Sequence, residues 1–103
     1  MAMKHYWVYM ITNANNTVIY TGVTNDIERR VRQHKGKTCP SFTQRYNLTK
    51  LVYYEGFGRI RDAIVAEKRI KAGSRAKKIK LIGNMNSDWR DLYDLKIASL
   101  RSQ

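Results

Sequence analysis

The stretch "VIYTGVTNDIERRVRQH", residues 18–34, begins like a β-strand and continues as a helix rich in arginine. Its first half is β-branched and aromatic, which favours an extended strand. Asn25 followed three positions later by Glu28 resembles a capping box, the pattern that starts a helix. We therefore expect a strand that runs directly into a helix over about 26–36.

A second strand pattern, "HYWVYMIT" (5–12), precedes this stretch across the turn-prone "NANN" (13–16). Together with 17–23 it predicts a β-hairpin. A loop of two or four residues makes the numbers of opposed positions sum to 29, which places Tyr9 opposite Tyr20. Directly opposed residues share a face of the sheet. Such a pair is either an ordinary aromatic contact of the core or part of a site.

Downstream, "KLVYYEG" (50–56) predicts a third strand after a basic loop (36–47). Apolar residues at helical spacing then predict helices over 59–73, 74–82 and 87–100. The order ββαβααα indicates one α/β (α+β) domain spanning residues 1–103. It is expected to contain a small, at least partly antiparallel three-stranded sheet flanked by helices.

The charge of the chain is its most unusual bulk property. Twenty Lys and Arg against eight Asp and Glu give a net charge of +12 in 103 residues. Such an excess predicts a polyanionic partner. Nucleic acid is favoured, because the sequence has neither a membrane-spanning run nor a basic amphipathic helix of the membrane-surface type. With Cys39 as its one cysteine, the chain suits a reducing compartment. We expect a cytoplasmic, nucleoid-associated protein without a membrane partner, and a monomer is favoured.

The helix over 26–36 carries a histidine on its apolar side. Ile27, Val31 and His34 follow the i, i+4, i+7 spacing of a core-facing stripe, with Arg30 beside them and Arg29 pointing outward. A histidine in this position is usually a packing residue with a hydrogen bond. The other interpretation is that His34 takes part in the function of the protein.

A glutamate occupies the same kind of position in the helix over 59–73. Glu67 lies three residues from Ile64 and four from Ala63, on the apolar stripe, where an unpaired carboxylate would be costly. It is expected to pair with Lys68, Lys71 or an arginine elsewhere, or to bind a metal ion. Two tyrosines, an arginine, a histidine and a carboxylate on one surface of a basic protein are the groups that cleave a phosphodiester.

In these positions the chain resembles the GIY-YIG nuclease family. It is most similar to small single-domain bacterial members, which are related to the N-terminal domain of the excision-repair nuclease. The two tripeptides of the family appear as Trp7-Val8-Tyr9 and Tyr20-Thr21-Gly22. Arg30 follows ten residues after the second tyrosine, His34 four residues later, and Glu67 matches the metal-binding glutamate.

The sequence departs from the family pattern in two places. Trp7 and Val8 stand where the first glycine and isoleucine are usual, while the tyrosine that carries the chemistry is kept. A further active-site asparagine of the family corresponds to Asn84 or Asn86, and the latter fits the tail of the small members better.

The resemblance implies a metal-dependent endonuclease that hydrolyses DNA, with RNA left open as a substrate. One Mg²⁺ or Mn²⁺ ion would be held by Glu67, and Arg30 would stabilise charge on the scissile phosphate. The candidates for the base that deprotonates water are Tyr9, Tyr20 and His34. We assign Tyr9 as the base, Tyr20 as the residue that orients water or phosphate, and His34 as a proton relay.

Residues expected to contact nucleic acid are basic or aromatic. They are Arg29, Lys35, Lys37, Phe42, Arg45, Tyr46, Lys71, Arg75, Lys77 and Lys78. Phe42 and Tyr46 could stack on unpaired bases, which favours single-stranded, branched or damaged DNA in repair or recombination. The alternatives are a nucleic-acid-binding protein that does not cleave, and a basic subunit of a repair complex on the same fold.

Overall fold

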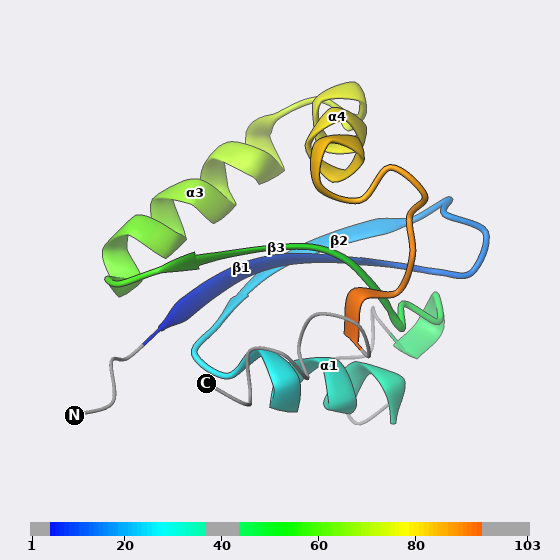
Figure 1. Cartoon of the computed structure of the whole chain (residues 1–103), viewed down its shortest axis with the longest axis horizontal. Helices are drawn as coiled ribbons and strands as arrows, with labels where there is room; N and C mark the ends of the chain where they lie inside the picture. The colour runs from blue at the N-terminus through cyan, green and yellow to red at the C-terminus, as the bar shows by residue number, and fades with distance from the viewer. Residues whose placement is uncertain (1–4, 37–43, 94–103) are drawn as a thin grey trace.

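A computed structural model describes residues 5–36 and 44–93 of the chain (Figure 1). Its elements follow in the order β1 (Tyr6–Thr12), β2 (Ile19–Thr24), α1 (Ile27–Lys35), β3 (Lys50–Phe57), α3 (Ile60–Ala72) and α4 (Arg75–Met85). This order confirms the predicted α+β class and the three-stranded sheet.

The strands form one antiparallel sheet in the order β2-β1-β3, so β1 is its central strand. In the hairpin, Tyr9 pairs with Gly22. The predicted register, which placed Tyr9 directly opposite Tyr20, is therefore wrong by two residues. A shift of two keeps the alternation of side chains, so the two tyrosines still share a face of the sheet.

The register differs because the hairpin loop is longer than predicted. The side-chain Oδ1 of Asn13 accepts hydrogen bonds from the backbone N–H groups of Thr17 and Val18, at 2.8 and 3.1 Å. Asn16 takes a left-handed conformation within the loop, with φ 58°. These contacts hold residues 17 and 18 in the loop, and β2 begins only at Ile19.

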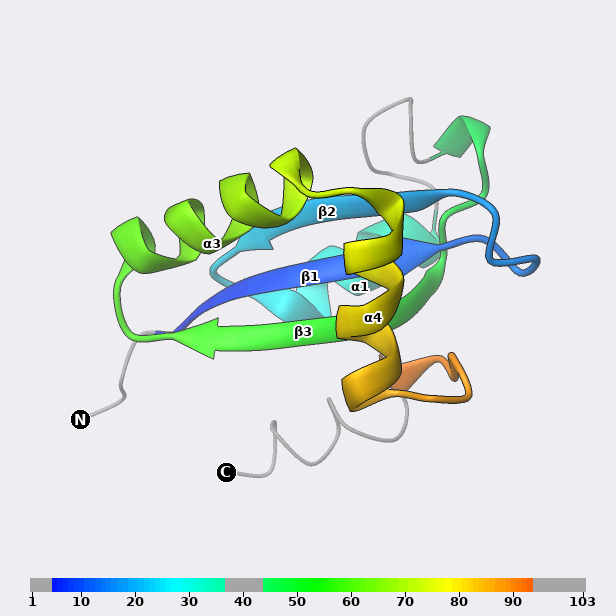
Figure 2. The same ribbon diagram turned by 90° about the horizontal axis from the view of Figure 1, so that it is seen from above.

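Alternating residues of β1 enter two separate cores. Tyr9 packs with Val31 of α1 on one face of the sheet. Met10 packs with Ile70 of α3 and Ile82 of α4 on the other. Figure 1 shows the same division, with α1 covering one face and α3 and α4 covering the opposite one. Seen from above, α3 runs along the strands and α4 crosses them (Figure 2).

Side chains cap the N-termini of α1 and α4. Asp26 is the N-cap of α1, and its Oδ1 accepts the backbone N–H of the residue three positions later at 3.1 Å. The cap predicted at Asn25 is wrong by one residue. Asn and Asp both cap helices well, so the residue type alone did not distinguish position 25 from position 26. Gly73 ends α3 as predicted, and the Oγ of Ser74 caps α4.

A buried asparagine attaches the segment after α4 to the sheet. The Nδ2 of Asn86 donates to the carbonyl groups of Val52, at 3.3 Å, and Arg90, at 2.7 Å. Its Oδ1 accepts the backbone N–H of Arg90 at 3.0 Å. Residues 87 and 88 form a turn and residues 89–91 have no regular structure, so the helix predicted over 87–100 does not begin at residue 87. Residues 94–100 of that prediction lie outside the described residues.

Candidate active site

Three aromatic side chains from β1, β2 and α1 meet on the α1 face of the sheet. The ring centroids of Tyr9 and Tyr20 are 6.3 Å apart, those of Tyr9 and His34 are 5.9 Å apart, and those of Tyr20 and His34 are 6.0 Å apart. The hydroxyl of Tyr9 also lies 3.2 Å from Nε2 of His34, within hydrogen-bond distance. The fold thus brings together three of the five predicted catalytic residues as one triangle of rings.

Gly22 creates the space that this triangle needs. A Cβ atom at that position would lie 2.6 Å from the hydroxyl oxygen of Tyr9 and 3.0 Å from Cε2 of Tyr20. Non-bonded carbon atoms prefer a separation of about 3.5–4.0 Å, so a side chain there would displace the hydroxyl. The glycine of the second tripeptide is therefore required by the position of Tyr9 across the hairpin.

His34 is buried, as its place on the apolar stripe predicted, with 2% of its surface exposed. Burial, and secondarily the positive charge of Arg30, lowers the pKa of His34 to about 4 from an ordinary value of 6.5. The imidazole is therefore neutral at pH 7. Its Nδ1 is buried and finds no hydrogen-bond partner among the described residues.

Arg30 belongs to both the ring cluster and a neighbouring hollow. It is half-buried, one turn before His34 on α1. The hollow has a volume of about 170 Å³ and is lined by Thr24, Asn25, Asp26, Arg29, Arg30 and Gln33. A polar hollow with two guanidinium groups is suited to an anion such as a phosphate, although the Asp26 carboxylate also lines it.

Glu67 approaches the cluster from the opposite side of the sheet. Its helix, α3, covers the face away from α1, which corrects the expectation that all five residues face one surface. Glu67 is linked to the ring cluster through Lys71 and Tyr20, at the edge strand β2. Oε2 of Glu67 is 3.3 Å from Nζ of Lys71. The Lys71 ammonium lies 5.9 Å from the ring centroid of Tyr20. The carboxylate is thus held near the cluster through Lys71.

The donor set around Glu67 is sparse. Within residues 5–36 and 44–93, no three His, Cys, Asp or Glu side chains gather as a metal site would require. A single carboxylate fits Mg²⁺, which keeps several water ligands and takes others from the phosphates of a substrate. The salt bridge with Lys71 competes with a metal ion for the same oxygens. The residues present therefore fit an ion that binds together with substrate.

Several residues predicted to bind nucleic acid already have partners within the fold. Lys35 forms an ion pair with Asp91 and donates to the carbonyl of Thr49 at 3.0 Å. Arg75 donates to the carbonyl of Asn16 at 3.2 Å. These contacts give both cations a structural role.

Others remain on the surface. Arg29 is exposed, and Arg45 lies over the ring of the exposed Tyr46, 5.8 Å from its centroid. Lys77 and Lys78 border a pocket between α3 and α4. The predicted contacts at residues 37 and 42 (Lys37 and Phe42) fall outside the described residues.

The structure distinguishes the two candidate asparagines. Asn86 uses both polar atoms of its side chain to bind backbone groups, so it supports the fold. Asn84 is exposed on α4 and lines the pocket between the two helices. The sequence indicated the cations of this pocket but not its apolar floor, which comes from the packing of α3 against α4.

The chain is similar to known proteins. Residues 5–80 match the family model described as the GIY-YIG catalytic domain. A UPF0213 protein of Natronomonas pharaonis is 38% identical over 84 residues, 82% of this chain and 96% of the relative. One from Staphylococcus saprophyticus is 37% identical over 79 residues, 77% of this chain and 94% of the relative.

A solved structure has the same architecture. The solution structure of a UPF0213 protein from Bacillus halodurans superposes with a TM-score of 0.55 at 25% identity, covering 89% of this chain and 97% of that one. Among the described residues, no helix has the length and apolar character needed to traverse a bilayer.

Proposed function

This chain belongs to the family of GIY-YIG catalytic domains, and we propose that it is a metal-dependent endonuclease that hydrolyses phosphodiester bonds in DNA. The observation that carries the proposal is the ring triangle of Tyr9, Tyr20 and His34, with Arg30 on one side and Glu67 on the other. Core packing alone does not account for a buried histidine that meets two tyrosine rings, with a guanidinium group one turn away on the same helix.

The burial of the two tyrosines supports different roles for them. Tyr9 is 1% exposed and its hydroxyl meets His34, whereas Tyr20 is half-buried at the edge strand. A residue that deprotonates an attacking water must reach that water. We therefore propose that Tyr20, which can reach the attacking water, is the base that deprotonates it. This replaces the assignment of Tyr9 as the base. The buried Tyr9 holds the other two rings of the cluster in position.

The state of His34 supports a role in orientation. With a pKa of about 4, the imidazole holds no extra proton at pH 7 and is a weak acceptor for one. Its 3.2 Å contact with Tyr9 fixes the direction of that hydroxyl. We propose this orienting role instead of the proton relay.

The charged residues would act on the phosphate. Arg30 is placed to stabilise charge that develops on the phosphate oxygens during cleavage. Glu67 is the residue that would hold a Mg²⁺ or Mn²⁺ ion, which supplies Lewis-acid stabilisation when it is bound. In the absence of substrate, Lys71 keeps the Glu67 carboxylate paired. A phosphate entering the site gives the Lys71 ammonium a second anion to contact.

The test is the substitution Glu67→Gln, which keeps the size of the side chain but removes its charge. Cleavage of labelled DNA in Mg²⁺ should fall by several orders of magnitude. The fold should persist, because Lys71 is 51% exposed and its lost salt bridge is worth less than about 1 kcal/mol. Asp62→Asn is the matched control, since Asp62 is an exposed carboxylate on the same helix.

A second candidate is a nucleic-acid-binding protein that does not cleave. It is favoured by one observation, the salt bridge that neutralises Glu67 with Lys71. Under this alternative, wild-type protein and Glu67→Gln would bind DNA equally and neither would cut single-stranded, duplex or branched DNA in Mg²⁺ or Mn²⁺. Cleavage by the wild type that disappears in EDTA and in Glu67→Gln decides for the endonuclease.

A further inference from the structure

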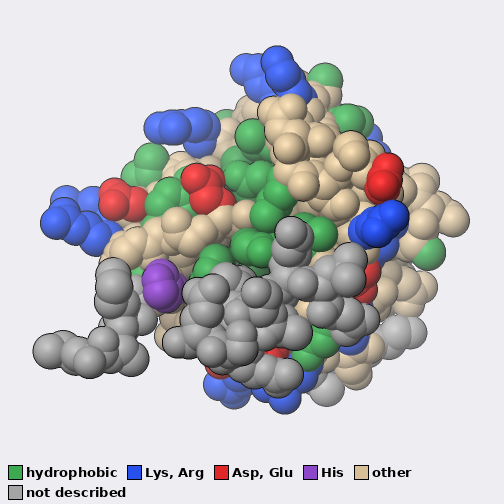
Figure 3. All heavy atoms as spheres, in the orientation of Figure 1, with side chains coloured by type: hydrophobic (Ala, Val, Ile, Leu, Met, Phe, Trp, Pro, Cys, Tyr) green, Lys and Arg blue, Asp and Glu red, His purple; other side chains and the backbone are tan. Residues whose placement is uncertain are grey.

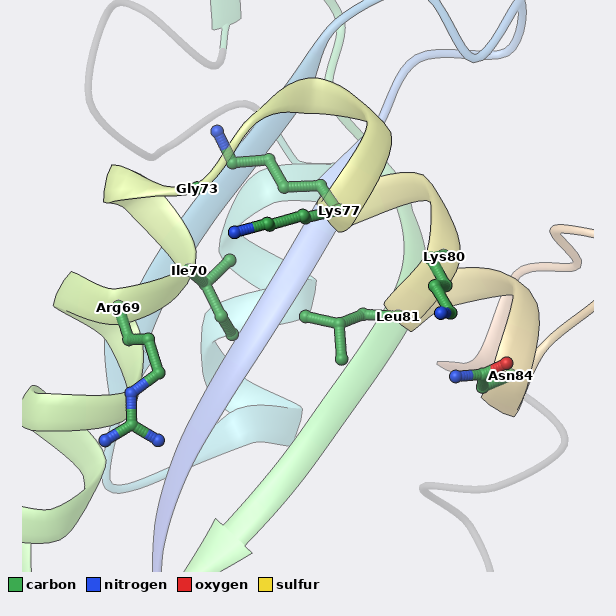
Figure 4. A pocket seen from close by; sticks show the side chains of 8 residues that line it. Arg69, Ile70, Gly73, Lys77, Lys80, Leu81 and Asn84 are labelled. Atoms are coloured by element: carbon green, nitrogen blue, oxygen red, sulfur yellow. The ribbon is translucent and has the colours of Figure 1, made fainter.

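A second pocket lies between α3 and α4, away from the ring triangle. It has a volume of about 380 Å³, within the range of about 300–1,000 Å³ typical of small-molecule sites. Ile70 of α3 and Leu81 of α4 point toward one another and form its apolar floor (Figure 4). In the space-filling view, hydrophobic side chains gather between these helices and Lys and Arg side chains project above them (Figure 3).

The rim of this pocket is positively charged. Arg69, Lys77, Lys78 and Lys80 surround the floor, and no acidic side chain contributes to the lining. None of these four forms a salt bridge with another described residue. A ligand that satisfies this rim is therefore an anion.

The first turn of α4 gives a second, independent indication of an anion. The N-terminus of a helix carries partial positive charge and is stabilised by acidic residues or by phosphate. Helix α4 has no acidic residue in its first turn and begins instead with Arg75, Lys77 and Lys78. Like charges are thus concentrated at the positive end of a helix. A bound phosphate would offset this unfavourable arrangement.

From these features we infer that the pocket binds one unpaired nucleotide of a single-stranded DNA segment. Its phosphate would contact Lys77 and Lys78 at the start of α4, and its base would cover Ile70 and Leu81. A cationic rim alone would accept any DNA phosphate. An apolar floor, however, can be covered only by a base that is free of its pairing partner.

The position of the pocket relates it to the cleavage site. Arg69 on its rim is two residues from Glu67 and about 200° from it around the axis of α3, a helix about 10–12 Å in diameter with its side chains. One strand crossing α3 could therefore occupy both sites. The inference rests on the proposed function, because it assigns an unpaired segment of the same DNA substrate to this pocket.

The test compares two substitutions on one helix. Arg69→Glu and Arg61→Glu change the net charge equally and alter exposed arginines of α3, but only Arg69 lines the pocket. Binding of a fluorescent oligothymidine strand is measured by anisotropy in EDTA, so that nothing is cleaved. Arg69→Glu should weaken binding about tenfold more than Arg61→Glu, because it places a negative charge on the rim that surrounds the bound nucleotide. For a blunt duplex the two variants should weaken binding equally.

The apolar floor is tested with Leu81→Ser and an abasic strand. This variant should weaken binding of the normal strand and leave binding of the abasic strand unchanged. If Leu81→Ser does not fold, Asn84→Trp at the exposed mouth of the pocket should produce the same difference by filling it.

Two outcomes would overturn the inference. One is an equal loss of single-strand affinity in Arg69→Glu and Arg61→Glu, and the other is an equal effect of the floor variants on normal and abasic strands. Failure of the nuclease proposal is seen separately. Binding in EDTA does not depend on cleavage, and a wild-type protein that binds unpaired DNA through the pocket without cutting any DNA refutes only the nuclease activity.

Discussion

Substituting Gly22 with Ala should disturb the ring triangle directly. The new Cβ atom would lie 2.6 Å from the hydroxyl oxygen of Tyr9. Ordinary van der Waals contact begins at 3.4 Å, so the hydroxyl must move by about 0.8 Å (3.4 minus 2.6). Tyr9 is 1% exposed and has little room to move. Overpacking of this kind costs about 1–3 kcal/mol, and losing the hydrogen bond to His34 adds about 1 kcal/mol.

We therefore expect Gly22→Ala to lower the free energy of unfolding by about 2–4 kcal/mol, measured by urea denaturation, and to reduce cleavage in the folded fraction. Gly83→Ala is the control, because a Cβ there meets nothing within 4 Å beyond its chain neighbours and the backbone of its own helix. In helix α4 it should be stabilising by about 0.5–1 kcal/mol. The new Cβ would also lie 2.8 Å from Cζ of Tyr9, so Tyr9→Leu, which removes both the hydroxyl and this ring atom, should partly rescue Gly22→Ala. Strictly additive effects of these two substitutions would refute the steric explanation.

Two further predictions concern stability. His34 has a folded-state pKa of about 4 and an ordinary value of 6.5, so the unfolded chain binds its proton first as the pH falls. The stabilising contribution of His34 is complete above pH 6.5 and declines by up to about 3 kcal/mol as the pH approaches 4. In urea titrations at several pH values, His34→Gln should make the free energy of unfolding depend less on pH. Asn86→Ala should lower the free energy of unfolding by about 1–3 kcal/mol, because it leaves buried backbone groups unpaired, whereas Asn84→Ala at an exposed site should not. Equal melting temperatures for the two asparagine variants would contradict the role assigned to Asn86.

The order of strands and helices was predictable because each element carries its own periodicity. The face shared by Tyr9 and Tyr20 was predictable for the same reason, since alternation along a strand survives a shift of two residues. The register itself was not. It depends on hydrogen bonds that the side chain of Asn13 makes within the loop, and the turn-prone letters do not reveal them.

The arrangement of the candidate site was only partly accessible from the sequence. Spacing placed His34 and Glu67 on the inner stripes of their helices, and His34 is indeed buried. Spacing cannot tell which face of the sheet a helix will cover, so the approach of Glu67 past the edge strand was missed. The pocket between α3 and α4 was missed similarly, because its floor consists of Ile70 and Leu81 from two different helices.

The central strand β1 has a consequence for how this protein can change during evolution. Val8 and Met10 point into one core, while Tyr9 between them points into the other, and all three are buried. A substitution that loosens the packing beneath α3 and α4 thus shifts the backbone that carries Tyr9. Substitutions in this strand therefore affect both the stability of the fold and the position of a proposed active-site residue. If the proposed nuclease function holds, new substrate preferences should therefore arise in the exposed residues of the helices and loops, on a sheet that stays constant.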